Sequence, residues 1–216
     1  MRLLPCGEDA ILVELDNADQ RRRLDDMLGR EPMSGVWAHV PADRTVLVRA
    51  DPPRIAAVAQ ALAGLESLVA GDEVGGRAGG GGVEVVPDPD PVVIPVTYDG
   101  PDLGEVADLL GVTADEVIAC HTGQLWRVEF SGFAPGFGYL VGRTGGLEVP
   151  RRDTPRTRIP AGSVGLAGPY SGVYPSASPG GWQLIGRTEV PMWRPEHDQP
   201  ALLRPGDWVV FEAAGS

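Results

Sequence analysis

Short apolar runs and two amphipathic segments follow one another through the first part of the chain. The run 10–16, AILVELD, predicts a strand, and 35–40 and 44–50 predict two more, separated by the turn signal PADR. Residues 17–30 predict a helix, and the Ala-rich stretch 52–69, which opens with two prolines, predicts another. This order of strand, helix, strand, strand and helix predicts a small α+β sandwich with its helices on one face of the sheet.

A glycine-rich segment, GDEVGGRAGGGG at 71–82, interrupts this pattern. So much glycine is too flexible for the inside of a packed element, which favours a linker or a mobile loop at a domain boundary. We therefore expect an N-terminal α+β domain over 1–82, ending in this linker, and a second domain over 83–216. An ordinary long surface loop within a single domain is the alternative.

Beyond the glycine-rich segment, helical periodicity occurs twice and then disappears. A strand is predicted at 92–100, and two helices follow, each opening at capping-box spacing: Asp102 with Glu105, and Thr113 with Glu116. Only short β runs, divided by Gly and Pro, come after these helices. They are 125–130, 163–168, 171–175, 181–188 and 208–213. This pattern predicts a closed or nearly closed antiparallel β-barrel.

The run FSGFAPGFGYL, residues 130–140, has neither the alternation of a strand nor the spacing of a helix. Its glycines would let the backbone approach a ligand or a neighbouring chain, while its aromatic rings form walls. A kinked strand at a barrel corner, with Phe filling the core, is the alternative that composition alone favours. The candidate binding residues of this run are Phe133, Pro135, Gly136, Phe137 and Tyr139.

A cluster of arginines lies in PRRDTPRTR, residues 150–158. Arg presents a planar fork of donors that suits carboxylate or phosphate groups. If Arg151 and Arg156 converge, they can clamp a small anion between them. Salt bridges to the many carboxylates of the chain are an equally good explanation.

Two further signals flank this cluster. Gly180 and Gly181 precede Trp182 and Gln183, and such a pair can expose backbone N–H donors to an oxyanion or form a hairpin turn. His121 follows a predicted helix and is the leading candidate for a general acid or base. A histidine that hydrogen-bonds carbonyl groups at the helix end is the commoner case.

Composition excludes several functions. The net charge is −12, and all 18 basic residues are Arg, so the chain lacks the Lys that a P-loop, a Schiff-base enzyme or a biotin carrier needs. The acidic balance argues against nucleic acid and anionic membranes as partners. Cysteines and histidines are scattered, so no metal site is expected. They are Cys6, Cys120, His39, His121 and His197. The N-terminus lacks the pattern of a signal peptide, and no stretch reaches the length of a membrane span, which predicts a cytoplasmic protein.

Several long motifs occur in a fixed order: HTGQLWRVEFSGFAPGFGYL, VPRRDTPRTRIPAGSVGLAG, SGVYP, SPGGWQLIGRT and LLRPGDWVVF. Together with the opening LLPCGEDAILVEL, they closely resemble the allophanate hydrolase subunit 1 family over nearly the whole chain. That family includes the B-type subunit of the prokaryotic 5-oxoprolinase and a sporulation-kinase inhibitor. The resemblance implies a small N-terminal α+β domain followed by a cyclophilin-like β-barrel domain.

The resemblance also implies partners and a reaction. The partners are a larger homologous subunit, of the allophanate hydrolase subunit 2 type or the C type of 5-oxoprolinase, and the A-type subunit of 5-oxoprolinase. The complex would use ATP to open the lactam of 5-oxoproline to glutamate, at a nucleotide site not assignable to this chain, and the chain alone would be inactive. Without its partner, an exposed hydrophobic patch could drive formation of a homodimer.

Site roles follow from motif position and chemistry. We expect the five residues of the aromatic run to form a rigid loop at the mouth of the barrel that contacts substrate or partner. Arg151 and Arg156 would hold a carboxylate, while His121 and Gln183 would hydrogen-bond the amide, beside Gly180 and Gly181. Trp126 departs from the family, which usually has Tyr after HTGQL, so any role of that hydroxyl is in doubt here.

Other functions compete with this hypothesis. Fused relatives of the family transfer a carboxyl group from biotin to urea, and this chain could be part of such a carboxyltransferase. A regulator that inhibits a histidine kinase through the aromatic loop is a second alternative. Prolyl isomerase activity rests on barrel type alone, and fold similarity does not transfer chemistry.

Overall fold

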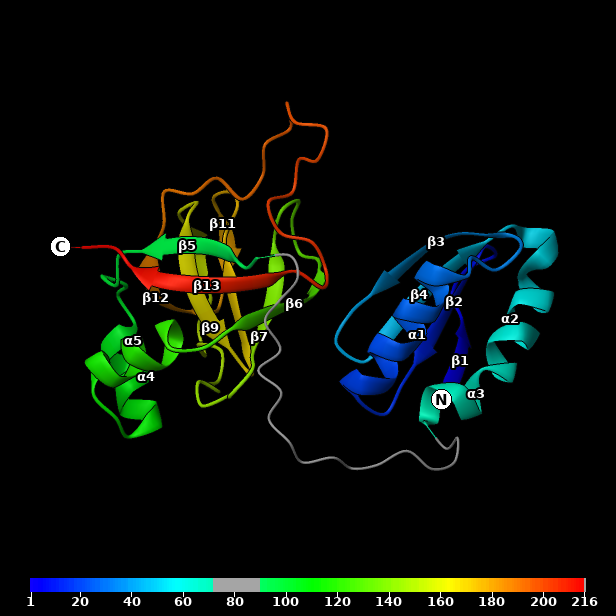
Figure 1. Cartoon of the computed structure of the whole chain (residues 1–216), viewed down its shortest axis with the longest axis horizontal. Helices are drawn as coiled ribbons and strands as arrows, with labels where there is room; N and C mark the ends of the chain where they lie inside the picture. The colour runs from blue at the N-terminus through cyan, green and yellow to red at the C-terminus, as the bar shows by residue number, and fades with distance from the viewer. Residues whose placement is uncertain (72–89, 216) are drawn as a thin grey trace. The chain divides into compact units, whose positions relative to one another are not determined.

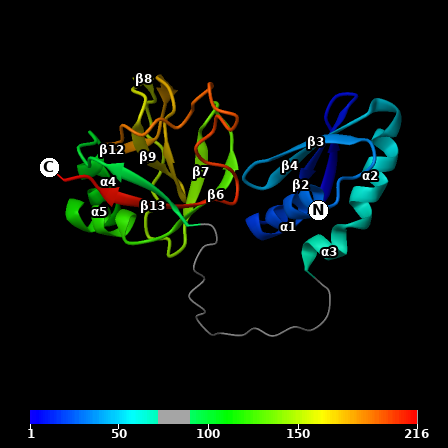
Figure 2. The same ribbon diagram turned by 45° about the horizontal axis from the view of Figure 1, so that its top comes forward.

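The computed structural model describes residues 1–71 and 90–215. The chain divides into two compact units, Met1–Val83 and Glu84–Ser216 (Figures 1 and 2). Except for Gly71, the glycine-rich segment predicted as a linker lies outside the described residues. The predicted domain boundary after residue 82 therefore stays a prediction.

The N-terminal unit is a four-stranded antiparallel sheet in the order β1-β2-β4-β3, with three short helices and one 3₁₀ turn. The strands are β1 (Arg2–Pro5), β2 (Ala10–Glu14), β3 (Val36–Pro41) and β4 (Thr45–Ala50). The helical elements are α1 (Ala18–Arg30), η1 (Pro52–Arg54), α2 (Ile55–Gly64) and α3 (Glu66–Ala70). The three predicted strands and the first predicted helix are present, and β1 is an additional strand. The single helix predicted over 52–69 is instead divided into η1, α2 and α3.

The helices of this unit cover one face of its sheet, as predicted (Figure 1). Alternate residues of a strand point to the same face. Val13 of β2 and Val46 of β4 are fully buried, and they share a single core with Leu24 of α1 and Leu62 of α2. The buried side chains of alternate strand residues and those on one face of α1 therefore pack together in one apolar layer.

The C-terminal unit holds a seven-stranded sheet in the order β12-β9-β10-β7-β6-β13-β5 and a two-stranded ribbon of β11 and β8. Its first elements are β5 (Val92–Val96), α4 (Leu103–Leu110), α5 (Ala114–Thr122), β6 (Trp126–Ser131) and β7 (Gly138–Gly142). The later strands are β8 (Arg156–Ile159), β9 (Ser163–Ala167), β10 (Tyr170–Val173), β11 (Ser178–Gly180), β12 (Gln183–Arg187) and β13 (Trp208–Ala213).

Hydrogen bonds between the two outer strands nearly close this sheet into a barrel, as the sequence predicts. Thr97, just after β5, exchanges two backbone hydrogen bonds of 2.8 and 2.9 Å with Arg187 at the end of β12. The N–H of Gly100 then donates to the carbonyl of Ile185. One pair, β5 with β13, is parallel, so the expected all-antiparallel barrel is wrong at that pair.

The two helices of this unit begin differently. Thr113 and Glu116 form the predicted capping box at the start of α5. Asp102 precedes α4, but its side chain makes no capping hydrogen bond, so the predicted box of Asp102 with Glu105 is absent. The reason is that its carboxylate is bonded elsewhere, to partners described below.

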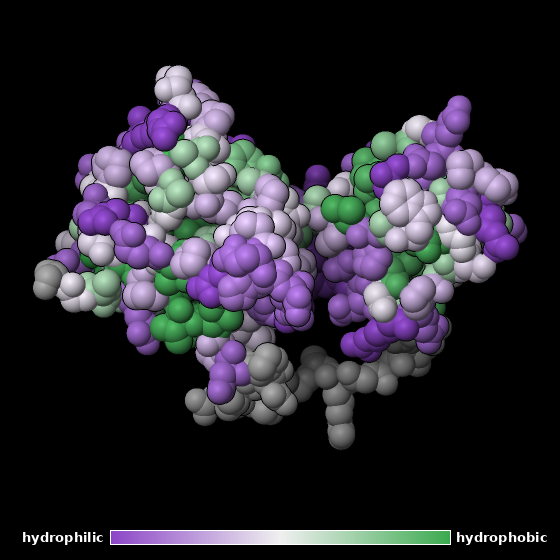
Figure 3. Space-filling view, turned by 90° about the horizontal axis from the view of Figure 1, so that it is seen from above, coloured by the Kyte–Doolittle hydropathy of each residue, from purple (hydrophilic) through white to green (hydrophobic). Residues whose placement is uncertain are grey.

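The surface view of the molecule mixes hydrophilic and hydrophobic residues over both units (Figure 3). Among the helices in the described ranges, none combines the length and apolar character needed to cross a bilayer. Large hydrophobic side chains are nevertheless exposed at isolated positions, and Phe133 has the highest exposed fraction among them, at 58%.

Candidate substrate pocket

The aromatic run 130–140 forms a hairpin. It ends β6, turns through 132–137 and begins β7, which explains why it shows no single period. Within the turn, Phe133 has a φ of 64°, in the left-handed region that few non-glycine residues adopt. Gly136 has a φ of 84°, and a Cβ there would lie 2.8 Å from the carbonyl oxygen of Met192. The turn is therefore held in a restricted shape.

A small pocket of about 90 Å³ opens beside this hairpin. Three segments far apart in the sequence supply its walls: the hairpin, the arginine-rich loop and the Gly-Gly strand with its neighbours. The residues that line it are Phe133, Phe137, Tyr139, Arg151, Tyr174, Gly180, Gly181 and Trp182. The structure thus brings together six of the predicted site residues and adds Tyr174 and Trp182.

Buried rings make the floor of the pocket rigid. Phe137 meets the rings of Tyr174 and Trp182 edge-on, at centroid distances of 5.4 and 5.3 Å. Phe137 is 1% exposed and Trp182 is 5% exposed, so neither ring has room to move. Phe133 contacts Phe137 at 5.3 Å but is mostly exposed, which places it at the rim. The pocket therefore has a fixed aromatic floor and one exposed ring at its edge.

Arg151 is the cation of this pocket. Within the part of the chain that the structure describes, its side chain makes no ion pair or hydrogen bond, and it is exposed. Burial raises the pKa of Tyr174 to about 12, while Arg151 acts in the opposite direction. Burial also raises the pKa of Tyr139. Both phenols are thus neutral at physiological pH and can donate hydrogen bonds beside an unpaired guanidinium.

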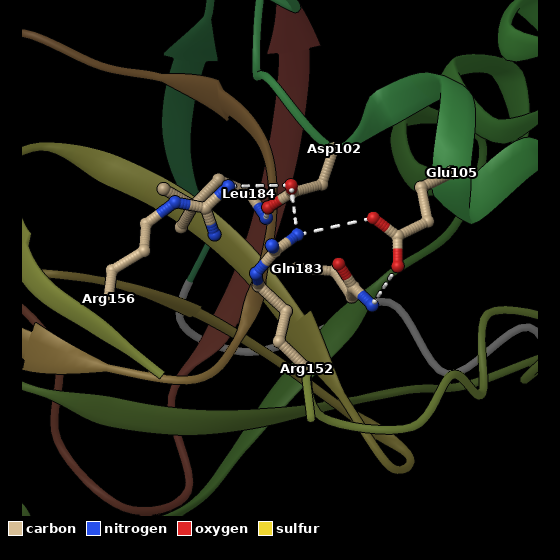
Figure 4. A network of polar contacts seen from close by, with 6 residues as sticks. All are labelled: Asp102, Glu105, Arg152, Arg156, Gln183 and Leu184. Atoms are coloured by element: carbon tan, nitrogen blue, oxygen red, sulfur yellow. Dashed lines mark hydrogen bonds and ion pairs between the residues drawn. The ribbon is translucent and has the colours of Figure 1, made fainter. Parts of the chain in front are cut away.

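A buried carboxylate is the centre of a polar network that includes sequence neighbours of pocket residues (Figure 4). Asp102 is 2% exposed. Its Oδ1 accepts hydrogen bonds from Nη1 of Arg152 at 2.8 Å and from Nη2 of Arg156 at 2.6 Å. Its Oδ2 accepts from the backbone N–H of Leu184 at 2.7 Å. A buried carboxylate needs such charged partners, and here it ties the start of α4 to β8 and β12.

Glu105 extends the network toward the Gly-Gly strand. It accepts a hydrogen bond from Arg152 at 3.2 Å and from the side-chain amide of Gln183 at 3.3 Å (Figure 4). The backbone N–H of Arg152 donates to the carbonyl of Gly181 at 2.8 Å. Arg152 and Gln183 each adjoin a pocket residue in the sequence. The network therefore fixes the backbone that presents Arg151 and Trp182.

The expected clamp of Arg151 and Arg156 is not formed. Arg156 is bonded to Asp102 and does not line the aromatic pocket, because it lies on β8 with its guanidinium in the network. Arg152, and not the predicted Arg151, comes together with Arg156, because both donate hydrogen bonds to Oδ1 of Asp102. Gln183 is 1% exposed and donates to Glu105, so its amide does not face the pocket, although its Oε1 has no partner. Pro135 and Gly136 lie in the hairpin turn, outside the lining residues.

His121 lies in the barrel core. Its exposed fraction is 0%, and its ring stacks on Phe211 at 4.2 Å. Nδ1 is 2.7 Å from the hydroxyl of Tyr98, and Nε2 is 2.9 Å from the hydroxyl of Ser171. Burial lowers the pKa of His121 to about 3, so the ring is neutral at physiological pH. This position supports a structural role, and the proposed acid–base role stays a prediction without support from the geometry.

Trp126, where the family usually has Tyr, also belongs to the core. It is 2% exposed, and its indole N–H donates to the carbonyl of His121 at 2.9 Å. It does not line the aromatic pocket. In this chain the position therefore serves the packing of α5 on the barrel.

In the described residues, no group of three or more His, Cys, Asp and Glu side chains is arranged to hold a metal ion. Cys6 and Cys120 are free thiols. The pocket itself offers rings, phenols, backbone and one guanidinium. Such a set suits a small planar anion better than a cation.

Known proteins are similar to this chain over half or more of its length. A family model described as carboxyltransferase domain, subdomain C and D, matches residues 1–203. The B-type subunit of the 5-oxoprolinase of Bacillus subtilis (strain 168) is 50% identical over 123 residues, which are 56% of this chain and 51% of that protein. The chain thus spans about half the length of the curated relatives that it matches.

Solved structures extend the comparison. A conserved uncharacterized protein from Pyrococcus horikoshii is 33% identical, with a TM-score of 0.57, and the match covers 99% of this chain and 97% of that one. The urea carboxylase of Kluyveromyces lactis has a TM-score of 0.70 at 21% identity, over 99% of this chain and 22% of that one. At that identity the likeness shows a common fold only.

Proposed function

Because the chain belongs to the family of carboxyltransferase domains, subdomains C and D (the allophanate hydrolase subunit 1 family), we propose that it is the B-type subunit of an ATP-dependent 5-oxoprolinase. In this complex, 5-oxoproline is opened to glutamate. Half of the aligned positions are identical to those of the B-type subunit of a 5-oxoprolinase. The aromatic pocket with the unpaired Arg151 is the observation that supports binding of 5-oxoproline by this chain.

The proposed substrate has two features that the pocket matches. Its carboxylate suits the guanidinium of Arg151, which can donate two parallel hydrogen bonds. Its flat lactam ring suits the floor made by Phe137 and Trp182. The hydroxyl of Tyr174, neutral because burial raises its pKa to about 12, is a donor for the lactam carbonyl. The small volume of about 90 Å³ selects a ligand of this size over a peptide.

The chain supplies binding and orientation in this proposal, whereas other subunits supply the reaction. No Asp, Glu or His is among the described residues that line the pocket, so a base that activates water must come from elsewhere. The partners we propose are a larger homologous subunit, of the C type, and the A-type subunit, in the cytoplasm. ATP is used by the assembled complex.

Reconstitution tests the proposal. The chain is mixed with the larger homologous subunit and the A-type subunit, and ATP-dependent release of glutamate from 5-oxoproline is measured. We expect release only when all three proteins are present. Equal release without this chain contradicts the proposal.

Substitution of Arg151 tests the pocket within the same assay. Arg151→Ala removes a charged hydrogen-bond donor, a loss of about 1.5–3 kcal/mol, and should raise the KM for 5-oxoproline by roughly 10- to 150-fold. Arg143→Ala is the matched control, since Arg143 is also exposed and lies outside the pocket. An unchanged KM for Arg151→Ala contradicts a role of Arg151 in binding 5-oxoproline.

Carboxyl transfer to urea is the second candidate function, and the family description favours it. A stable complex with the larger subunit that releases no glutamate, yet carboxylates urea, would establish it. Inhibition of a histidine kinase through the exposed Phe133 remains a third outcome of the same binding experiments.

A further inference from the structure

We propose that a second pocket of the C-terminal unit binds a phosphoryl group. This pocket has a volume of about 320 Å³ and shares no lining residue with the aromatic pocket. Three arginines line it, Arg156, Arg158 and Arg187, together with Asp99 and Ser163. It is a concentration of positive charge in a chain whose net charge is −12.

The barrel brings these arginines together. Arg156 and Arg158 are two residues apart on β8, so their side chains leave the strand on the same face. Arg187 ends β12 and is fixed by its two backbone hydrogen bonds to Thr97, where the sheet closes. The arginines therefore come from two rigid strands rather than from a mobile loop, which is the arrangement that a specific anion site needs.

The donors of the pocket are only partly used. Arg158 makes no ion pair or hydrogen bond among the described residues, and Nη1 of Arg156 is buried without a partner. The hydroxyl of Ser163 has no hydrogen-bond partner in the same set, although the residue is 6% exposed. Arg187 is bonded to Asp99 at 2.9 Å and to Glu189 at 3.3 Å. A tetrahedral oxyanion can thus accept bonds from Arg156, Arg158 and Ser163 while Arg187 contributes charge.

The space next to this pocket indicates a ligand larger than a single phosphate. Arg187 also lines an adjoining pocket of about 380 Å³, whose other walls include Pro95, Thr97, Val190 and Pro191. Apolar walls beside a cluster of arginines suit an organic group attached to the phosphoryl group. A nucleoside polyphosphate and inorganic pyrophosphate share the phosphoryl chemistry that we propose, and binding measurements separate them.

This inference does not rest on the proposed function, because it concerns another pocket and is tested on the chain alone. Isothermal titration calorimetry with pyrophosphate, ATP and adenosine measures binding to the full chain without partners. We expect pyrophosphate and ATP to bind and adenosine to bind at least tenfold more weakly. Tighter binding of ATP than of pyrophosphate assigns the adjoining pocket to the nucleoside, and equal binding assigns the site to the phosphoryl group alone.

Arg158→Gln is the decisive variant. Arg158 is exposed and has no partner among the described residues, so its loss leaves the fold intact, which circular dichroism checks. We expect at least tenfold weaker binding of pyrophosphate and ATP by Arg158→Gln. Arg143→Gln, an exposed arginine outside both pockets, should bind as the parent chain does. Binding of neither ligand at millimolar concentration, or equal binding by Arg158→Gln and the parent chain, overturns the inference.

Discussion

Asp102 and Leu184 exchange two hydrogen bonds across 82 residues of sequence. The backbone N–H of Asp102 donates to the carbonyl of Leu184 at 3.0 Å, and the N–H of Leu184 donates to Oδ2 of Asp102 at 2.7 Å. The side chain of Asp102 thus replaces a backbone carbonyl in the hydrogen bonding that closes the barrel. Its other oxygen pairs with Arg152 and Arg156, so one carboxylate joins barrel closure to the arginine-rich segment 150–158.

Asp102→Ala should destabilise the chain strongly. The substitution leaves the partly buried Arg156 without a carboxylate, leaves Arg152 with Glu105 alone, and leaves the N–H of Leu184 without its side-chain acceptor. We expect a loss of about 3 kcal/mol in the free energy of unfolding, measured by denaturant titration. Asp108→Ala, on the exposed side of the same helix, is the control and should change it by less than about 0.5 kcal/mol. Equal stability of the two variants contradicts this role of Asp102.

The buried His121 predicts a decrease in stability at acid pH. Its pKa is lowered to about 3 in the folded chain, while the unfolded chain keeps the ordinary value of about 6.5. Between these pH values the unfolded state binds more protons, so the free energy of unfolding falls as pH is lowered from about 6.5 toward 3, by up to about 1.4 kcal/mol per pH unit.

Comparison of variants isolates this contribution. His121→Gln removes the titrating group and should show a shallower fall over that pH range, whereas His197→Gln, at an exposed histidine, should follow the parent chain. Urea titrations at pH 7, 5 and 4 measure the slopes. If the free energy of unfolding falls equally steeply with decreasing pH in all three proteins, that result would falsify the contribution of His121.

The two adjacent glycines of the pocket should respond differently to alanine. A Cβ at Gly180 would lie 2.6 Å from the hydroxyl oxygen of Tyr174 and 2.8 Å from Cδ1 of Ile159, whereas the nearest atom to a Cβ at Gly181 is 3.7 Å away. Gly180→Ala should therefore displace Tyr174 and cost about 1–3 kcal/mol. Near-ultraviolet circular dichroism reports the ring environment, and a similar change in Gly181→Ala contradicts the prediction.

At position 133, a glycine variant should be more stable than an alanine variant, which is the reverse of the usual order of stability. Because its φ is 64°, Phe133→Gly relieves a backbone conformation that Phe133→Ala retains, and the glycine variant should be more stable by about 1 kcal/mol. Leu109→Gly and Leu109→Ala form the control pair at an exposed helix position, where alanine should be the more stable. Thermal unfolding of the four variants measures these stabilities. If the alanine variant is the more stable one at both positions, the backbone of Phe133 is not strained.

Local patterns predicted the elements well where a strand or helix is long enough to show its period. The helices and most strands lie where alternation, capping residues and turn signals place them. The strand β7 was not predicted because the aromatic run that leads into it contains a turn. The strands β8 and β11 were not predicted because they have only four and three residues. Such short strands exist because partners far along the chain stabilise them, which no local pattern records.

The site was predicted in composition but not in detail. Arg151 and Arg152 are chemically identical neighbours, yet one lines the aromatic pocket and the other binds Asp102. Asp102 has the spacing of a capping residue, but its carboxylate accepts a hydrogen bond from the backbone N–H of Leu184 instead. Leu184 lies near Asp102 only because the barrel closes. The same holds for His121, whose ring stacks on Phe211 of the last strand, a contact that no local pattern around His121 records.

The parallel pairing of β5 with β13 has a mechanical consequence. Val92 pairs with Val209 at one end of this ladder and Val96 pairs with Ala213 at the other. The strand that enters the barrel and the strand that leaves it are therefore side by side and point the same way, as Figure 1 shows. A pull between residue 91 and residue 214 acts along the strands in shear. All ladder hydrogen bonds then bear the load together instead of opening one after another, so the C-terminal unit resists extension along that direction most strongly.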